Sequence, residues 1–136
     1  MPKTAAASKA NFPAVFDALR GVLRAQSKGM KVEVDSAKTY YVNTNEPHPS
    51  GKGLIFFAAV KINASYVSYH LMPLYIEPAL RKSVSPALKR HLHGKACFNF
   101  KTIEPAVLMD LAAITKLGAS CFKKLGPNIL GAKKSA

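Results

Sequence analysis

The chain has 136 residues, of which 49% are hydrophobic and 20% charged, and this balance predicts one domain with a single buried core. With only two cysteines, no signal-peptide stretch at the N-terminus and no run near the roughly 20 apolar residues that cross a bilayer, we expect a cytoplasmic protein without disulfides. The 20 Lys and Arg against 7 Asp and Glu give a net charge of +13, which favours anionic partners such as nucleic acid, phosphorylated metabolites or acidic proteins.

The N-terminal part predicts a loose tail followed by a helix. Residues 1–10 are small and polar, so we expect no regular structure there. From Phe12 onward, apolar residues recur at helical spacing, with Asn11 placed as the N-cap and Gly29 as the terminator. The first helix should therefore begin the folded domain.

Two short strands and a loop are predicted next. Apolar and charged residues alternate over Met30–Asp35, which is the period of a half-buried strand, and Thr39–Val42 predicts a second short strand. Residues 43–53 are rich in turn formers, so we expect a surface loop there.

The stretch Leu54–Leu71 predicts the central hairpin of the sheet. Whether the turn holds Asn63 and Ala64 or the four residues Ile62–Ser65, Lys61 is expected opposite Tyr66. An apolar side, expected to face helices, then pairs Val60 with Val67, Ala58 with Tyr69 and Phe56 with Leu71. A mixed side pairs Lys61 with Tyr66, Ala59 with Ser68 and Phe57 with His70. A bulge would shift this register.

The rest of the chain predicts short helical pieces, one strand and one long helix. Residues 72–94 carry helix signals at Pro78 and Pro86, Ala96–Phe100 alternates as a strand, and an apolar stripe runs along a helix from Pro105 to Gly126. We therefore predict an α+β fold, an antiparallel sheet with the N- and C-terminal helices packed on one face. The single domain should span residues 11–126, and residues 127–136 should form a basic tail.

Three stretches carry a family resemblance: KTYYVNTNEPHPSGKGLIFFAAVKINASYVSYHLMPLY, SPALKRHLHGKACFNFK and EPAVLMDLAAITKLGASCF. Over roughly residues 11–125 they resemble the YdhG-like domain family, bacterial domains of unknown function that are sometimes labelled frataxin-like iron chaperones. The most telling pieces are YVSYHLMPLY and HGKACFNFK, in which a glycine-lysine pair precedes a short aromatic strand. The resemblance implies an α+β sandwich and brings no established activity, catalytic residue or cofactor.

Two groups of residues are candidate ligand-binding surfaces. One is basic, because no acid occurs between Glu77 and Glu104; there, Lys95 after the helix-ending Gly94 could bind phosphate or carboxylate with Lys101 and Arg90. The alternative is a solvated helix face that keeps the protein soluble. The other group is the mixed side of the hairpin, where Lys61, Tyr66 and His70 surround small residues. Cover by a chain segment or by a second copy in a homodimer is the competing interpretation for this side.

Metal binding and catalysis have weaker signals. His91, His93 and Cys97 invite a zinc or copper interpretation, but the two histidines do not share a helix face and no fourth ligand is evident. Cys97 between Lys95 and Lys101 could be a low-pKa thiol. Iron favours carboxylates, and only seven acids are present. We therefore expect no metal, no cofactor and no catalytic residue.

The leading hypothesis is a non-enzymatic binding domain for an anionic small molecule or an acidic protein partner. The alternative is a nucleic-acid-binding accessory protein, because Tyr40, Tyr41 and Phe98 occur near lysines and could stack on single strands. The sequence contains no helix-turn-helix, ribonucleoprotein or zinc-finger motif. An iron chaperone ranks lower, and no reaction class is indicated for an enzyme.

Overall fold

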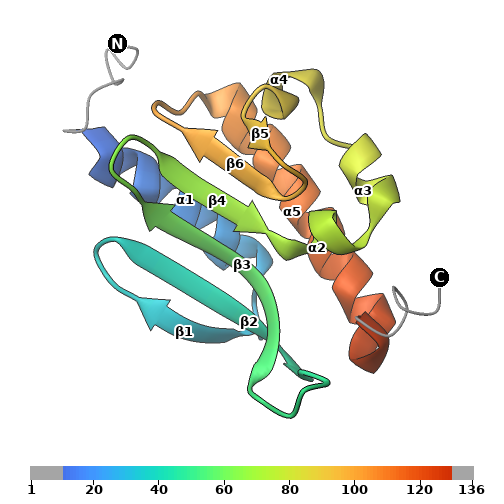
Figure 1. Ribbon diagram of the computed structural model, residues 1–136. Helices are drawn as coiled ribbons and strands as arrows, with labels where there is room; N and C mark the ends of the chain where they lie inside the picture. The colour runs from blue at the N-terminus through green and yellow to red at the C-terminus, as the bar shows by residue number, and fades with distance from the viewer. Residues whose placement is uncertain (1–10, 130–136) are drawn as a thin grey trace.

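Six antiparallel strands form one sheet, in the spatial order β1-β2-β3-β4-β6-β5, in the computed structural model, which describes residues 11–129 (Figure 1). The strands are β1 (Lys31–Asp35), β2 (Thr39–Pro47), β3 (Leu54–Ile62), β4 (Val67–Leu71), β5 (Leu92–His93) and β6 (Cys97–Phe100). The helices are α1 (Phe12–Gln26), α2 (Met72–Ile76), α3 (Pro78–Lys82), α4 (Pro86–Lys89) and α5 (Pro105–Leu125), and the short 3-10 helix η3 (Gly126–Asn128) follows. The predicted N-terminal tail and residues 130–136 lie outside the described residues.

Helices α1 and α5 pack together and against one face of the sheet, so the predicted α+β architecture is confirmed (Figure 1). The predicted stripe of α1 is buried, from Phe12 through Leu19 to Leu23. On α5 the buried positions are Val107, Leu111, Ile114, Thr115, Gly118 and Phe122. Because α2, α3 and α4 also pack against α5, the helices form one layer and the sheet the other.

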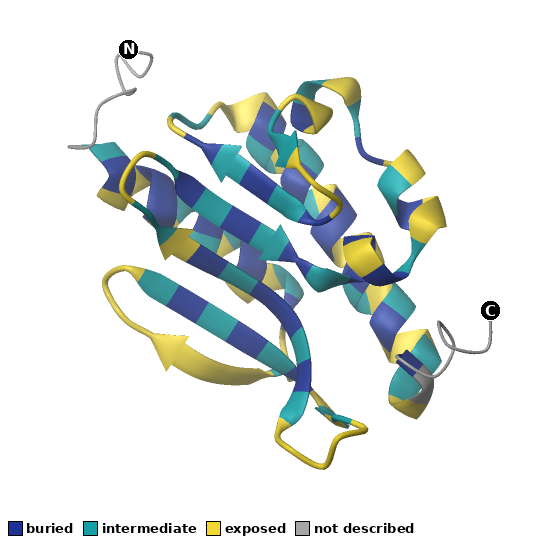
Figure 2. Ribbon diagram, viewed as in Figure 1, coloured by how far each residue is buried: buried dark blue, intermediate teal, exposed yellow. Residues whose placement is uncertain are grey.

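The inner face of the sheet, which meets these helices, follows the alternation that the sequence predicts. Along β4, Val67, Tyr69 and Leu71 are buried and the residues between them are only half-buried (Figure 2). Strand β6 repeats the pattern with Phe98 and Phe100 inward. Successive side chains of a strand point to opposite sides, so one apolar face can pack on helices while the other stays open.

The predicted register of the β3–β4 hairpin is wrong by two residues. Ile62 pairs with Val67 and Lys61 with Ser68, and the backbone N–H of Asn63 donates to the carbonyl of Tyr66 at 2.8 Å. The loop therefore holds four residues but starts one residue later than in the predicted four-residue turn. Because the shift is even, it leaves each residue paired in this ladder on its predicted side.

A β-bulge reverses the predicted sides of the two phenylalanines in β3. Val42 of β2 pairs with Ala58, but the next residue, Asn43, pairs with Phe56, so Phe57 is an extra residue in β3. Phe57 is consequently fully buried and its ring contacts Phe122 of α5 at 6.0 Å. Phe56, predicted to face the helices, points to the other side of the sheet, because an inserted residue shifts the alternation by one.

Strands β1 and β2 also differ from the prediction. Every residue of β1 is exposed, although a half-buried strand was predicted, because β1 is an edge strand with its own bulge between Val32 and Val34. Strand β2 continues to Pro47, through the first five residues of the predicted loop, and its polar Thr44 is buried with its hydroxyl donating to the carbonyl of Ile55 at 2.9 Å. Cross-strand pairing here overrides the turn-forming composition.

Helix α5 is held to the sheet by a buried hydrogen-bonded chain. The Thr115 hydroxyl donates to the carbonyl of Leu111 at 2.7 Å, so it accepts from the hydroxyl of Tyr69, which lies 2.8 Å away. Burial raises the pKa of Tyr69 far above its usual value. This helix is the one among residues 11–129 that is long and apolar enough to cross a membrane by length and composition alone, a criterion that core helices of soluble domains also meet. Past the predicted domain end, Ile129 still belongs to the core.

Candidate functional site

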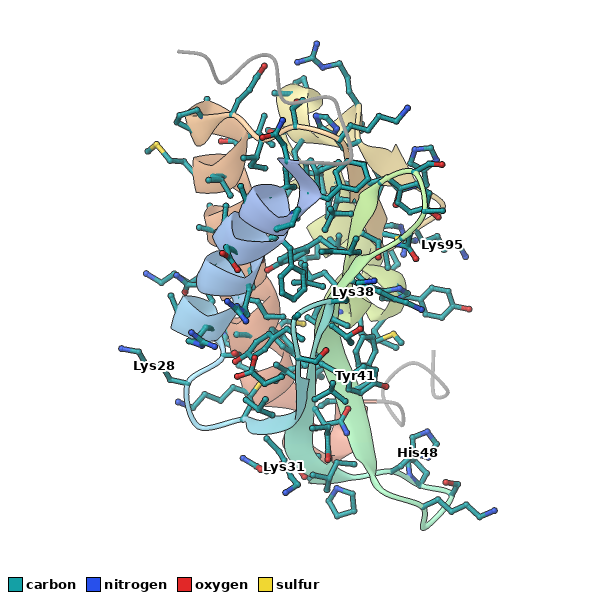
Figure 3. All side chains as sticks on the ribbon, turned by 90° about the vertical axis from the view of Figure 1, so that its left-hand side faces the viewer. Lys28, Lys31, Lys38, Tyr41, His48 and Lys95 are labelled. Carbon is teal, nitrogen blue, oxygen red and sulfur yellow. The ribbon has the colours of Figure 1, made fainter. Side chains whose placement is uncertain are left out.

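The sheet side turned away from α1 and α5, called the outer face, is covered by no helix of residues 11–129 (Figure 1). Figure 3 views the sheet edge-on, with α1 on one side of it and Lys95 on the other. The register places on the outer face Thr39 and Tyr41 of β2, Phe56, Ala59 and Lys61 of β3, Ser68 and His70 of β4, and Cys97 and Asn99 of β6. All are half-buried except Lys61, which is exposed.

Three rings lie side by side across the middle of this face, and we call them the aromatic row. The ring of Tyr41 lies 4.8 Å from that of Phe56, with a tilt of 31° between the planes. The Phe56 ring meets the His70 imidazole edge-on at 5.4 Å. Because the bulge turns Phe56 outward, strands β2, β3 and β4 each contribute one ring. Ala59, which lies between Tyr41 and His70 in the register, is too small to cover these rings.

His70 is a neutral ring in this setting. It lies between Ala59 of β3 and Cys97 of β6, and partial burial lowers its pKa below the usual histidine value. Desolvation disfavours the charged imidazolium, so the side chain carries no charge at neutral pH. It therefore extends the apolar surface of Phe56 and adds no cation of its own.

Lysines gather at one end of the outer face, which we call the basic end. Strand β2 starts, β3 ends and β6 ends there, since Thr39 pairs with Lys61 and Val67 with Phe100. Tyr66 lies in the hairpin loop at this end, so Lys61 and Tyr66 share it but are not directly paired. The lysines are Lys38 in the β1–β2 turn, Lys61, and Lys101 directly after β6.

The second predicted anion site is not brought together. Lys95 precedes β6 and Lys101 follows it, so the two are separated by about 20 Å of extended chain. The Lys95 ammonium lies 5.5 Å from the centre of the Tyr75 ring, as a cation–π pair. Arg90 instead lines a separate hollow of about 220 Å³ together with Glu104. These three cations therefore cannot hold one small anion.

Cys97 does not have the environment of an activated thiol. Its sulfur lies 3.6 Å from the side-chain oxygen of Asn99, and partial burial raises its pKa. A reactive cysteine needs the opposite shift. The low-pKa thiol that the sequence left open is therefore not supported, because desolvation disfavours the thiolate.

Most of the acidic side chains have structural partners. Asp17 and Asp35 form ion pairs with Arg20, and Asp35 also pairs with Arg24. Glu33 accepts from the Asn43 amide at 3.0 Å, Glu77 accepts from the N–H of Ala79, and Asp110 accepts from the Ser85 hydroxyl at 2.7 Å. Within residues 11–129 no group of three or more His, Cys, Asp or Glu side chains could hold a metal ion, although His70, Cys97 and His93 occupy adjacent strands.

One well-formed hollow was not indicated by the sequence. A groove of about 470 Å³, called the helix-end groove, lies between the end of α1, the end of β2 and the second half of α5. Its lining includes Lys28, Lys116, Lys123 and Glu46. These residues are spread over most of the chain, so no local motif could have indicated them.

Comparison with known proteins adds no identity: no family model, no curated protein and no solved structure matches this chain. The resemblance to the YdhG-like family stays a prediction, and the functional argument depends on the geometry alone.

Proposed function

We propose that the protein is a non-enzymatic binding domain whose outer face receives an anionic partner, and that this partner is a single-stranded nucleic acid. The observation that carries the proposal is the aromatic row of Tyr41, Phe56 and His70, half-buried on an uncovered sheet face that ends in lysines. Open sheets with aromatic rings in mid-strand suit unpaired bases, which stack on the rings while the phosphates meet cations.

The rings that support this proposal are not those that composition alone indicated. Tyr40 and Phe98 are buried on the inner face, where no base can reach them. Tyr41 is the predicted stacking residue that lies on the outer face, and Phe56 and His70 join it there. The proposal therefore depends on the register rather than on the number of aromatic residues.

A polymer fits the outer face better than a small anionic molecule does. Lys61, Tyr66 and His70 line neither of the two best-formed hollows in the described part of the chain. A flat surface leaves most of a small ligand in water, whereas a strand can follow the row from the basic end. Cations at both ends, Lys61 and Lys101 at one and Lys95 at the other, suit a ligand with repeated charges.

Fluorescence anisotropy with a labelled 12-nucleotide single-stranded RNA at low salt tests the proposal. Each base stacked on an aromatic side chain contributes about 1–3 kcal/mol, so Phe56→Ala and Tyr41→Ala should each weaken binding about 5- to 150-fold. Lys61→Ala should reduce the slope of log affinity against log salt by about 0.7, the share of one phosphate contact with a single strand. Lys124→Ala removes the same charge from α5 and serves as the matched control.

Three results would overturn the proposal. One is a lack of binding at low salt. Another is equal weakening by Lys61→Ala and Lys124→Ala with no effect of Phe56→Ala, which would mean that charge alone drives binding. The third is equally strong competition by poly-L-glutamate, which would favour an acidic protein partner instead.

A further inference from the structure

The helix-end groove is a second, separate hollow with the dimensions of a small-molecule site. Its volume of about 470 Å³ lies inside the range of roughly 300–1,000 Å³ that is usual for ligand pockets. Its apolar lining includes Met30, Ala119, Phe122 and the fully buried Ile129. The groove lies between the helix layer and the sheet layer, on the far side of the sheet from the aromatic row.

Three lysines line this groove against one acid. Lys28 follows α1, whereas Lys116 and Lys123 belong to α5, and Glu46 of β2 is the single carboxylate in the lining. None of the three lysines forms an ion pair within residues 11–129, where the ion pairs are those of Arg20 and Arg24. Lys28 is on the helix side of the molecule in Figure 3.

Helix ends account for two of these cations. A lysine at the C-terminal end of a helix stabilises the negative end of the helix dipole; Lys123 is in the last turn of α5, and Lys28 directly follows the C-cap of α1. Lys116 is more than two turns before the end of α5. Because the dipole effect fades within one turn, the presence of Lys116 in the groove has no such explanation.

The net charge at the groove remains positive after its carboxylate and the negative helix ends are counted. Three ammonium groups and one carboxylate leave two positive charges. The C-terminal ends of α1 and α5 each contribute about half a negative charge. About one positive charge remains, beside an apolar floor and the polar Gln26 and Ser120.

We propose that the helix-end groove binds a small organic anion with an apolar body, a carboxylate or phosphate ester whose charged group meets Lys116 and Lys123 while its body lies on Met30 and Ala119. This site is independent of the outer face, so the two proposals can fail separately. A fully polar anion lacks the body that the floor would desolvate, and a neutral apolar molecule leaves the lysines without a counter-ion.

Titration calorimetry with 2-naphthoate, and with the uncharged 2-naphthamide as the matched ligand, tests the proposal on the full chain. We expect stoichiometric binding of 2-naphthoate at least tenfold tighter than that of the amide. Backbone amide shifts in NMR spectra should cluster at residues 28–30, 44–46 and 119–123. Lys116→Gln and Lys123→Gln should each weaken naphthoate binding about tenfold, and the neighbouring Lys124→Gln, outside the groove, should leave it unchanged.

A variant that fills the groove distinguishes binding inside it from non-specific attraction to the positive charge of the protein. Ser120 is exposed and lines the groove, so Ser120→Phe should occupy the hollow and abolish naphthoate binding while the protein stays folded. RNA binding at the outer face should be the same in Ser120→Phe, Lys116→Gln and the wild type. Equal affinity for the acid and the amide, unchanged binding in Lys116→Gln, or shifts centred on Tyr41 and His70 would each overturn the proposal.

Discussion

Phe56 and Phe57 are neighbours in the chain but belong to opposite faces of the sheet, and the two faces differ in what holds them. Phe57 on the inner face is fully buried and packs on Phe122 of α5. Phe56 on the outer face has its ring against those of Tyr41 and His70, which are also partly exposed. The inner face is therefore required for stability, whereas the outer face keeps apolar area in reach of solvent.

This difference teaches where to look for function in a domain without a recognisable motif. Apolar residues that pack inward are explained by the core, and their identity says little about ligands. Partly exposed rings that gather on an uncovered sheet beside lysines have no such explanation, and they support the proposal that this face is an interaction surface. Substitutions on each face can test whether the inner face determines stability and the outer face does not, as the burial of their residues indicates.

The largest expected effect is on the inner face. Phe57→Ala should lower the free energy of unfolding by about 3–5 kcal/mol, because it leaves a cavity between β3 and α5. Urea denaturation followed by circular dichroism measures the loss as a lower midpoint at unchanged slope. A loss below about 1 kcal/mol would mean that the bulge does not direct Phe57 into the core.

The next effect concerns the buried hydroxyl chain that joins the inner face to α5. Thr115→Val keeps the shape but leaves the Tyr69 hydroxyl without its partner, which should cost about 1–3 kcal/mol of unfolding free energy.

Adding Tyr69→Phe removes the hydroxyl that Thr115→Val leaves without a partner. The double variant should therefore be more stable than the sum of the two single losses predicts. The same urea experiments on all four proteins give the coupling. Strict additivity would contradict the hydrogen bond between the two side chains.

On the outer face, Phe56→Ala should cost only about 1 kcal/mol, because part of the ring already contacts water. Compared with Phe57→Ala under the same conditions, it is the sharpest test of the bulge, since the two variants differ by one position. Equal losses from both would mean that the two rings are not divided between the faces.

The smallest effect is a pH dependence that His70 brings to the outer face. Burial lowers the pKa of His70 in the folded protein. At pH values between the usual histidine pKa of about 6.5 and this lowered pKa, the unfolded chain therefore binds a proton more readily than the folded protein does. The contribution of His70 to stability is therefore fully present above about pH 6.5 and is lost as the pH falls through the lowered pKa.

Urea midpoints from pH 7.5 to pH 4.5 should fall less steeply for His70→Gln than for the wild type. The neighbouring Cys97 stays a neutral thiol over this range, because burial raises its pKa. Identical profiles would show that His70 is not desolvated.

Local pattern was sufficient to predict the layers of this protein. The 3.6-residue stripes predicted α1 and α5, and the alternation from Val67 to Leu71 predicted which side of β4 faces them. Even the two-residue error in the hairpin left the paired residues on their predicted sides, because the side-chain period of a strand is two. Lys61 and His70 were consequently assigned correctly to a common face.

Tertiary structure decided the parts on which both proposals depend. Whether Phe56 or Phe57 points inward follows from the bulge against β2, and a run of consecutive apolar residues contains no local signal for that choice. The helix-end groove forms only where residues from α1, β2 and α5 meet, and their lysines are about 90 positions apart in the chain. Periodicity is a local property that the sequence carries by itself, whereas pairing partners and shared hollows depend on segments that only folding brings into contact.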